Sequence, residues 1–404
     1  MIESGTQKGD ASLNRSPVFN FDYFAEPSIL ADVHEGYMQL KKNAPPVFWT
    51  PANGGHWVVT SADAVTQVLR HPEIFSSRVL SIPPDPDQQK MLPIMLDPPE
   101  HRAYRQMLRP FFETKAIAPL QPRIDEWAEK LIGDIAEGGE CEFVEAVGSR
   151  FPVLVFMELF GFPLEQFELF RGTVVEFFSA TAEPDRRRQL AMQIVMLISE
   201  LLEKRRAEPR DDLISKLVHL DFEGRKLTQE ELISIGFLMF LAGLDTVVNA
   251  LTFGIRHLAH DKAMRQRMID DPGCIPQAVE ELLRRYAFVS VPRYVAQETE
   301  LEGSRLHQGD SILVPLAMLG WDEKHTECPE KVSLDRPHCR HAAFGSGVHT
   351  CLGIHLARME METFFRVWLN RIGDFKQVEK VVASYRTGSV QALEELHLSW
   401  ETRK

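Results

Sequence analysis

The segment FGSGVHTCLG, residues 344–353, places a cysteine, a basic residue and several glycines in one short run. Cys351 stands directly before a stretch with the periodicity of an amphipathic helix. The positive end of the helix dipole there favours a thiolate over a thiol. Gly353 removes side-chain bulk beside the sulfur, and His349 can bring a donor close to an anionic group. The run therefore predicts a reactive cysteine, with a buried structural cysteine beside a glycine turn as the alternative.

The run LAGLDTV, residues 241–247, interrupts a strongly apolar helical pattern with an acid and an alcohol. Ala242 and Gly243 leave a flat strip without bulky side chains, which suits a planar ligand and a small substrate. An aspartate such as Asp245 is costly in an apolar helix unless it is paired or functional. Its structural alternative is that the carboxylate binds backbone groups at a helix kink.

Residues 97–105, DPPEHRAYR, predict the start of a helix. Asp97 and Glu100 have the three-residue spacing of a capping box, and the proline after Asp97 suits a first helical turn. His101 and Arg105 then lie four residues apart on one face of that helix. This face is a candidate anion-binding surface, with an ordinary solvated basic face as the alternative.

Glu281 and Arg284 form a second charged pair, spaced i,i+3 on a predicted helix over residues 276–287. Pairs of this kind are common on solvated helix surfaces, where they contribute a few tenths of a kcal/mol. The spacing alone assigns no chemistry to them.

The elements that must position these residues are mostly helical. Apolar residues recur every three to four positions in several long segments, so we predict helices there. Proline-rich residues 81–96 predict an irregular surface loop, Gly309 predicts the turn of a hairpin within 304–317, and short strands are expected after Ile372. We expect a mainly α fold with small sheets, organised as a flexible tail (1–17) and a single domain (18–404).

Composition excludes several classes of function. The net charge of −13 disfavours nucleic acid and anionic membranes as partners. The longest apolar run, Ile233–Leu244, is shorter than the ~20 residues of a membrane span, so we expect a core helix and no membrane anchor. The 5 cysteines contain no C-x-x-C pair, so neither a zinc knuckle nor a ferredoxin-type cluster is expected. The pattern is typical of a cytoplasmic protein with reduced thiols.

Taken together, these motifs resemble the cytochrome P450 enzymes. The match of the haem-binding loop covers Phe344, Gly347, His349, Cys351 and Gly353, and the remaining motifs follow in the family's order from about Phe75 onward. The resemblance implies the cytochrome P450 fold around a buried haem b (iron protoporphyrin IX), with the thiolate of the cysteine as axial ligand.

The resemblance also implies roles for the other motifs. Asp245 and Thr246 would lie over the distal haem face, where Thr246 would hydrogen-bond dioxygen and Asp245 would relay protons from solvent. Glu281 and Arg284 would form a structural pair. The haem propionates would be bound by His101, Arg105, Arg293 and His349.

The reaction implied is monooxygenation, in which one atom of dioxygen enters a C–H bond and the other leaves as water. The two electrons required must come from outside, because the chain has no cysteine set for an iron–sulfur cluster, no G-x-G-x-x-G and no P-loop. We expect an acidic ferredoxin with its reductase. Its docking surface on the cysteine side would include Arg102, Arg340 and Arg358.

Within the family, LAGLDTVVNALTF, EELLRRY and GSVQAL resemble the bacterial camphor hydroxylase branch most. That branch orients camphor with a tyrosine in the loop that corresponds to residues 81–96, which contain no tyrosine here. We therefore expect a different small apolar substrate, a terpenoid or norisoprenoid. Candidate pocket residues are Met91, Leu238, Leu241, Ala242, Val289 and Val291, for which core packing is the alternative.

Two other functions remain open at this stage. A peroxide-using haem-thiolate hydroxylase would share the cofactor, although retention of Asp245 and Thr246 favours dioxygen. A non-catalytic protein that binds a hydrophobic ligand would contain no haem and would be colourless.

Overall fold

The computed structural model describes residues 17–86, 88–178, 183–378 and 383–402. Residues 1–16 of the predicted tail lie outside the described residues. Pro17, the last residue of that tail, does not behave as a free end, because its carbonyl accepts a hydrogen bond from the backbone N–H of Trp49 at 2.8 Å. Val18 continues the contact as an isolated bridge to Trp49. These two contacts attach residues 17 and 18 to Trp49.

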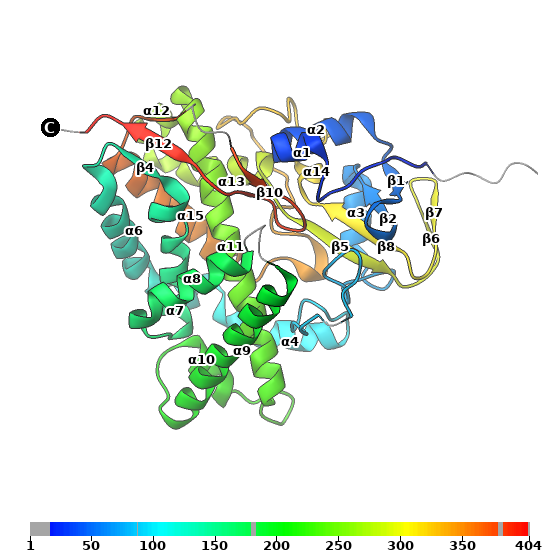
Figure 1. Cartoon of the computed structure of the whole chain (residues 1–404), viewed down its shortest axis with the longest axis horizontal. Coiled ribbons are helices and arrows are strands. Elements are labelled where there is room, and N and C mark those ends of the chain that lie inside the picture. The colour runs from blue at the N-terminus through cyan, green and yellow to red at the C-terminus, as the bar shows by residue number, and fades with distance from the viewer. Residues whose placement is uncertain (1–16, 87, 179–182, 379–382, 403–404) are drawn as a thin grey trace, which may run out of the picture.

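A mixed sheet occupies one side of the molecule, with the first helices packed around it (Figure 1). Its strand order is β1-β2-β8-β5-β3, antiparallel throughout except between β2 and β8. These strands are β1 Val47–Thr50, β2 His56–Val59, β3 Phe75–Ser76, β5 Ser290–Val295 and β8 Ser311–Pro315. The helices on this side are α1 Pro27–Ala31, α2 Val33–Asn43, α3 Ala62–Arg70 and α14 Ala317–Gly320.

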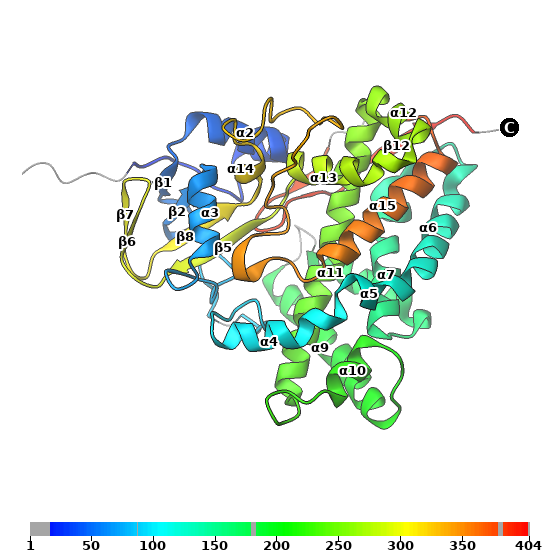
Figure 2. The ribbon, with the colours of Figure 1, turned by 180° about the vertical axis from the view of Figure 1, so that it is seen from behind.

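The other side of the molecule is helical, as the periodicity predicts (Figure 2). Its helices are α4 Glu100–Leu108, α5 Thr114–Ile117, α6 Gln121–Ala136, α7 Arg150–Phe160, α8 Phe167–Phe178, α9 Pro184–Ala207, α10 Leu213–His219, α11 Gln229–His260, α12 Lys262–Asp270, α13 Ile275–Arg285 and α15 Ile354–Arg371. The expected short strands after residue 372 are present: β9 Phe375–Gln377 pairs with β12 His397–Trp400 beside β4 Glu140–Glu142, and β10 Tyr385–Arg386 pairs with β11 Ala392–Leu393.

Helix α11 runs through the middle of the molecule in both views (Figures 1 and 2). It begins with a complete capping box between Thr228 and Glu231. By length and composition it could cross a membrane, but 56% of its most apolar window is buried inside the protein, as in a core helix. Two hydrophobic clusters meet along it: buried residues up to Leu244 belong to one, and those from Val247 onward belong to the other. The AGLDT run lies at this junction.

The hairpin predicted around Gly309 is wrong in its pairing. Gly309 does turn the chain, with φ of 102°, but the strands on either side of it do not pair with each other. The hairpin forms one turn earlier, between β6 Thr299–Leu301 and β7 Ser304–Leu306, where Glu302 and Gly303 both have positive φ. Two consecutive residues with positive φ match the twist of paired strands, and β8 is taken up by the large sheet instead.

The capping role predicted for Asp97 is also wrong. Helix α4 begins at Glu100 after Pro99, without a side-chain cap. The carboxylate of Asp97 instead accepts hydrogen bonds from the Ser76 hydroxyl and, at 2.9 Å, from the Ser77 backbone N–H. It therefore fastens the start of α4 to the end of β3.

Candidate active site

The cysteine loop folds back on itself between the sheet side and α15. The backbone N–H of Cys351 donates to the carbonyl of Phe344 at 2.8 Å, which closes the loop. Gly345 and Gly347 both have φ of 72°, a conformation that L side chains rarely adopt. At Gly347 a Cβ would also lie 2.4 Å from the carbonyl oxygen of Leu69 in α3. The glycines of this run are thus required by the loop's conformation and packing.

Protein surrounds the loop on most sides. Cys351 itself is nevertheless exposed, so its side chain borders open space. Burial raises the pKa of its thiol, and the Gly353 backbone N–H, Arg105 and Arg358 offset this only in part. The cysteine lies two residues before the N-cap Gly353, so it is outside the first turn, where the dipole acts most strongly.

Four basic side chains converge beside this loop, and we call them the basic cluster: His101, Arg105, Arg293 and His349. The rings of His101 and His349 have centroids 4.1 Å apart. Arg105 donates from Nη2 to the Thr350 carbonyl at 2.5 Å. Burial, followed by the positive charges of Arg293, His101 and Arg105, lowers the pKa of His349 to about 2. The structure therefore gathers four candidates from separate parts of the chain into one site, in which Arg105 and Arg293 carry the positive charge and the two histidine rings are neutral at pH 7.

The basic cluster lacks acidic partners. Within the described part of the chain, no ion pair links any of the four side chains to a carboxylate, and the Nε2 atoms of His101 and His349 are buried without hydrogen-bond partners. Arg293 is 6% exposed, burial lowers its pKa to about 10, and Asp97 is the acid that opposes this shift. That acid already accepts hydrogen bonds from Ser76, the last residue of β3, and from Ser77 directly after it. Buried cations are normally paired, so the cluster fits a ligand that supplies carboxylates.

The face of α11 at the junction of the two hydrophobic clusters stays partly open. Ala242 is exposed although it lies in the middle of the longest helix, and Leu238, Leu241 and Thr246 are half-buried. A Cβ on Gly243 would approach Phe156 at 3.3 Å, so this glycine packs against α7. Positions 238, 242 and 246 follow one another at four-residue spacing, on the same helix face. Of the two residues predicted to form an open strip, Ala242 is exposed, whereas Gly243 packs against Phe156 of α7.

Asp245 has a partner that the sequence did not suggest. Nη2 of Arg386, from β10, binds Oδ2 of Asp245 at 2.5 Å, and Nη1 of the same arginine donates to the Phe178 carbonyl at 2.6 Å. Thr246 donates its hydroxyl hydrogen bond to the Ala242 carbonyl at 2.7 Å. One arginine therefore holds the acid of α11, the end of α8 and the C-terminal hairpin together.

The remaining pocket candidates lie on both sides of this face. Met91 is buried at 8% exposure, and it packs in the same hydrophobic cluster as Leu238 and Leu241. Val289 and Val291 are half-buried beside the other cluster, with Val289 bridged to Val390. Met91 is thus buried and contributes little surface to the open face of α11.

The proline-rich loop is fastened to α11 rather than detached from it. The Leu92 backbone N–H donates to the Ser234 hydroxyl at 2.9 Å, and that hydroxyl donates to the Lys90 carbonyl at 2.7 Å. The half-buried side chains of Ile94, Met95 and Leu96 follow directly and pack against the cluster that contains Leu238. Sequence reasoning missed them because a loop carries no periodicity that reveals which side chains face inward.

Glu281 and Arg284 are fully buried and not a solvated surface pair. Nε of Arg284 binds Oε1 of Glu281 at 2.9 Å, Arg336 Nε binds the same oxygen at 2.8 Å, and the Ser333 N–H donates to Oε2 at 3.0 Å. Arg284 also donates to three backbone carbonyls, at residues 320, 329 and 331. We call Glu281, Arg284 and Arg336 the acid-bridged cluster; it fastens the chain that leads into the cysteine loop.

The predicted docking arginines differ in their freedom. Arg102 and Arg340 are exposed. Arg358 forms a bidentate pair with Glu280, at 2.7 and 2.8 Å, and its guanidinium lies 5.2 Å from the centroid of the Phe344 ring. Arg358 therefore supports the cysteine loop and offers less charge to a partner than the prediction assumed.

The comparisons with known proteins agree with this geometry. The cytochrome P450 family model matches residues 274–372. A probable cytochrome P450 127A1 from Sinorhizobium fredii is 33% identical over 95% of this chain and 94% of its own. The crystal structure of CYP101J2 has a TM-score of 0.87 at 33% identity, covering 95% of this chain and 97% of that one. The structure of cytochrome P450 CYP101C1 has a TM-score of 0.90 at 29% identity, covering 97% and 99%.

The chain belongs to the cytochrome P450 family. It is a bacterial-type cytochrome P450 monooxygenase of the camphor hydroxylase branch, with the mainly α fold of that family. The cofactor of these enzymes is haem b, held by a cysteine thiolate. The residues present fit this group: a cysteine borders open space, a basic cluster lacks carboxylates, and a small residue leaves α11 open.

Proposed function

We propose that this monooxygenase binds its haem through Cys351 and the basic cluster, and hydroxylates a small apolar substrate over the open face of α11. When bound, a thiolate-ligated haem supplies dioxygen activation, because the thiolate pushes electron density onto the iron and favours O–O cleavage. The observation that carries the proposal is the convergence of four buried or half-buried basic side chains, none of them ion-paired with an acid among the described residues, beside an accessible cysteine.

The chain's own residues have separate tasks in this proposal. Cys351 provides the metal ligand, and the Gly353 backbone N–H steadies its sulfur. His101, Arg105, Arg293 and His349 bind the two propionates, for which charge-assisted hydrogen bonds are strong and directional. The backbone of Gly347, wedged against Leu69, fixes the loop's position relative to α3.

Asp245 and Thr246 handle protons on the substrate side. The Thr246 hydroxyl reorients from the Ala242 carbonyl to donate toward dioxygen, and Asp245 supplies protons to it. Arg386 holds the Asp245 side chain in place between turnovers, through the hydrogen bond from its Nη2 at 2.5 Å.

The substrate in this proposal is a compact terpenoid or norisoprenoid. The side chains around the open face are apolar, with Ala242, Leu238 and Leu241 on α11 and Met95 and Leu96 on the loop. Apolar walls with few polar groups select by shape.

Electrons reach the haem from an iron–sulfur ferredoxin with its reductase, and the enzyme works in the cytoplasm. The exposed Arg102 and Arg340 offer positive charge on the cysteine side of a chain whose net charge is −13. Local charge of this kind steers an acidic partner. Reversing both charges, Arg102→Glu with Arg340→Glu, should lower the second-order rate of reduction by ferredoxin about tenfold at low salt and little at high salt. An unchanged rate at both salt concentrations would remove this docking surface.

The first test is the absorption difference spectrum of the dithionite-reduced protein with and without carbon monoxide. The wild-type protein should give the strongly red-shifted Soret band of thiolate-bound ferrous haem. Cys351→Ala should lose that band, whereas Cys328→Ser, which changes another exposed cysteine, should retain it. A red-shifted band in Cys351→Ala would refute the ligand assignment.

Turnover assays distinguish the proposed dioxygen-dependent reaction from that of a peroxide-using hydroxylase. Product formation that requires reduced ferredoxin and dioxygen supports the proposal, and product formation from peroxide alone identifies a peroxide-using hydroxylase. A terpenoid panel that produces neither a spin-state shift nor turnover would eliminate the proposed substrate class.

A further inference from the structure

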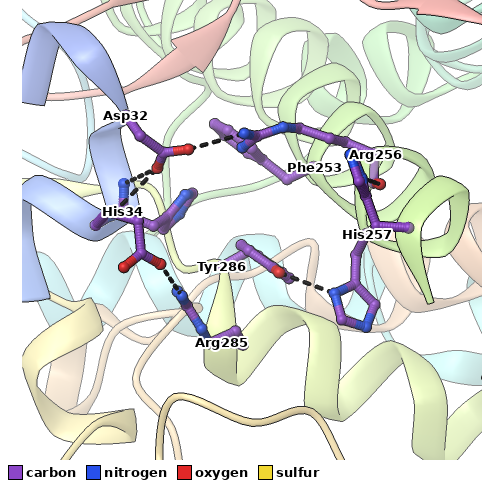
Figure 3. A pocket seen from close by; sticks show the side chains of 9 residues that line it. Asp32, His34, Phe253, Arg256, His257, Arg285 and Tyr286 are labelled. Carbon is purple, nitrogen blue, oxygen red and sulfur yellow. Dashed lines mark hydrogen bonds and ion pairs between the residues drawn. The ribbon is translucent and has the colours of Figure 1, made fainter. Parts of the chain in front are cut away.

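A second cavity of about 250 Å³ lies away from the cysteine loop, where the start of α2 meets the last turns of α11 and the end of α13 (Figure 3). Its walls carry mostly polar and charged side chains, including Asp32, His34, Arg256 and Arg285. A cavity of this size holds far more than the one water that fills roughly 10–15 Å³ of such space. Nothing in the proposed monooxygenase reaction uses it.

Two ion pairs frame the cavity. Arg256 Nη2 binds Asp32 Oδ2 at 2.9 Å, and Arg285 Nη2 binds Glu35 Oε1 at 2.5 Å (Figure 3). The Tyr385 hydroxyl also donates to Asp32 at 2.9 Å, so that carboxylate is shared. Nε of Arg285 also donates to the Glu330 carbonyl at 2.9 Å, so Arg256 is held through one guanidinium nitrogen and Arg285 through two.

Other donors of the same side chains are left without partners. Among the described residues, Nε of Arg256 and Nη1 of Arg285 are buried and make no hydrogen bond, and the buried His34 ring has no partner besides the Tyr286 backbone. The His34 side chain belongs to a residue that is 1% exposed, and its ring lies edge-on to Phe253 and Tyr286. A buried donor without a partner costs about 1–3 kcal/mol. Such a concentration of donors around one cavity indicates a ligand that accepts hydrogen bonds.

The formal charges of the two ion pairs at the cavity balance, but the two acids differ in their exposure to solvent. Burial and then the positive charge of Arg285 lower the pKa of His34 to about 3, so the ring is neutral at pH 7. The Glu35 side chain is 58% exposed, whereas that of Arg285 is buried. Solvent therefore screens the attraction between the Glu35 carboxylate and the Arg285 guanidinium. The buried end of Arg285 is therefore under-neutralised.

We propose that this cavity binds a small oxyanion, a carboxylate or a phosphate, through Arg256 Nε, Arg285 Nη1 and the His34 ring. The guanidinium groups present fixed N–H donors to its oxygens, the geometry in which arginine recognises both anions. The ligand joins α2 to the ends of α11 and α13, and by mass action it stabilises the folded protein.

The test is a titration of the haem-loaded enzyme at pH 7 with sodium phosphate and, separately, with sodium acetate, each against sodium chloride at equal ionic strength. Haem loading keeps the basic cluster occupied, so an unchanged Soret spectrum separates this site from that one. We expect a saturable heat of binding and a saturable rise in Tm with one or both oxyanions. Phosphate alone or acetate alone would identify the anion class, and no saturable binding of either would overturn the proposal.

Variants locate the binding. Arg256→Lys keeps a cation for Asp32 but removes the Nε donor, and it should weaken binding about tenfold. Arg366→Gln is the matched control, because it alters an exposed pair with Asp125 on another face, and it should bind as the wild type does. Equal affinity in wild type and Arg256→Lys would refute the site. If Arg256→Lys does not fold, His34→Asn should weaken binding in the same assay, and unchanged affinity there would refute the site equally.

Discussion

The basic cluster and the acid-bridged cluster both gather basic side chains within the protein, but they differ in their counter-charges. In the acid-bridged cluster, one fully buried carboxylate binds two arginines, and backbone carbonyls satisfy the remaining donors of Arg284. In the basic cluster, four side chains converge without an ion-paired acid among the described residues. The first is complete within the protein, and in our proposal the propionates of haem complete the second. Buried charge that is paired thus indicates scaffolding, and buried charge that is unpaired indicates a ligand.

The largest effect is expected from breaking the complete cluster. Glu281→Gln removes the charge that faces Arg284 and Arg336, and an uncompensated buried cation costs about 3–5 kcal/mol. Urea unfolding should show this loss in the apoprotein and the haem-loaded protein alike. Glu137→Gln, at an exposed position, is the control. A loss below 1 kcal/mol would mean that the cluster does not support the fold.

The incomplete cluster should respond in the opposite sense. Arg293→Met removes a desolvated cation, so the apoprotein should keep its stability or gain about 1 kcal/mol. Haem should dissociate about 10–100-fold faster, which corresponds to one charge-assisted hydrogen bond of ~1.5–3 kcal/mol. Transfer of haem to an apomyoglobin acceptor measures the rate. Destabilised apoprotein with unchanged haem release would reverse the distinction between the clusters.

The pH dependence of stability tests the ion pair between Glu280 and Arg358 beside the cysteine loop. Burial would raise its pKa, but hydrogen bonds from His341 and Arg358 lower it to about 2. Its contribution to stability is therefore present above the unfolded value of 4.5 and is lost as pH falls from 4.5 toward 2. Glu280→Gln should cost roughly 1–2 kcal/mol at pH 7 and flatten the acid limb of the stability profile. An unaltered acid limb would show that the pair contributes nothing.

The smallest effect should come from a pair that is complete but exposed. Arg371 binds Glu129 at 2.7 Å, with 51% of the arginine side chain exposed. Arg371→Gln should change the free energy of unfolding by less than about 0.5 kcal/mol. A loss as large as that of Glu281→Gln would mean that pairing matters regardless of burial.

Much of the fold was predictable because local periodicity dictates it. The helices around residues 121–136, 184–207 and 354–371 follow from apolar residues at three- and four-residue spacing, which must face a core. The hairpin at Gly309 was mispredicted because a glycine marks a turn without saying which strands pair. Pairing depends on partners distant in sequence, such as β2 and β5 on either side of β8.

The sequence by itself determined the chemistry of this protein: a cysteine in a glycine loop, an acid–alcohol pair in an apolar helix, and basic residues at characteristic positions. These signals are local, since each depends on residue types within a few positions of one another. Only the tertiary structure decided how the charges are paired. It joined Asp245 to Arg386 across 141 residues, buried Glu281 with Arg336, and left the basic cluster without an acid. Electrostatic energy depends on distance and burial in space, and neither can be read from positions along the chain.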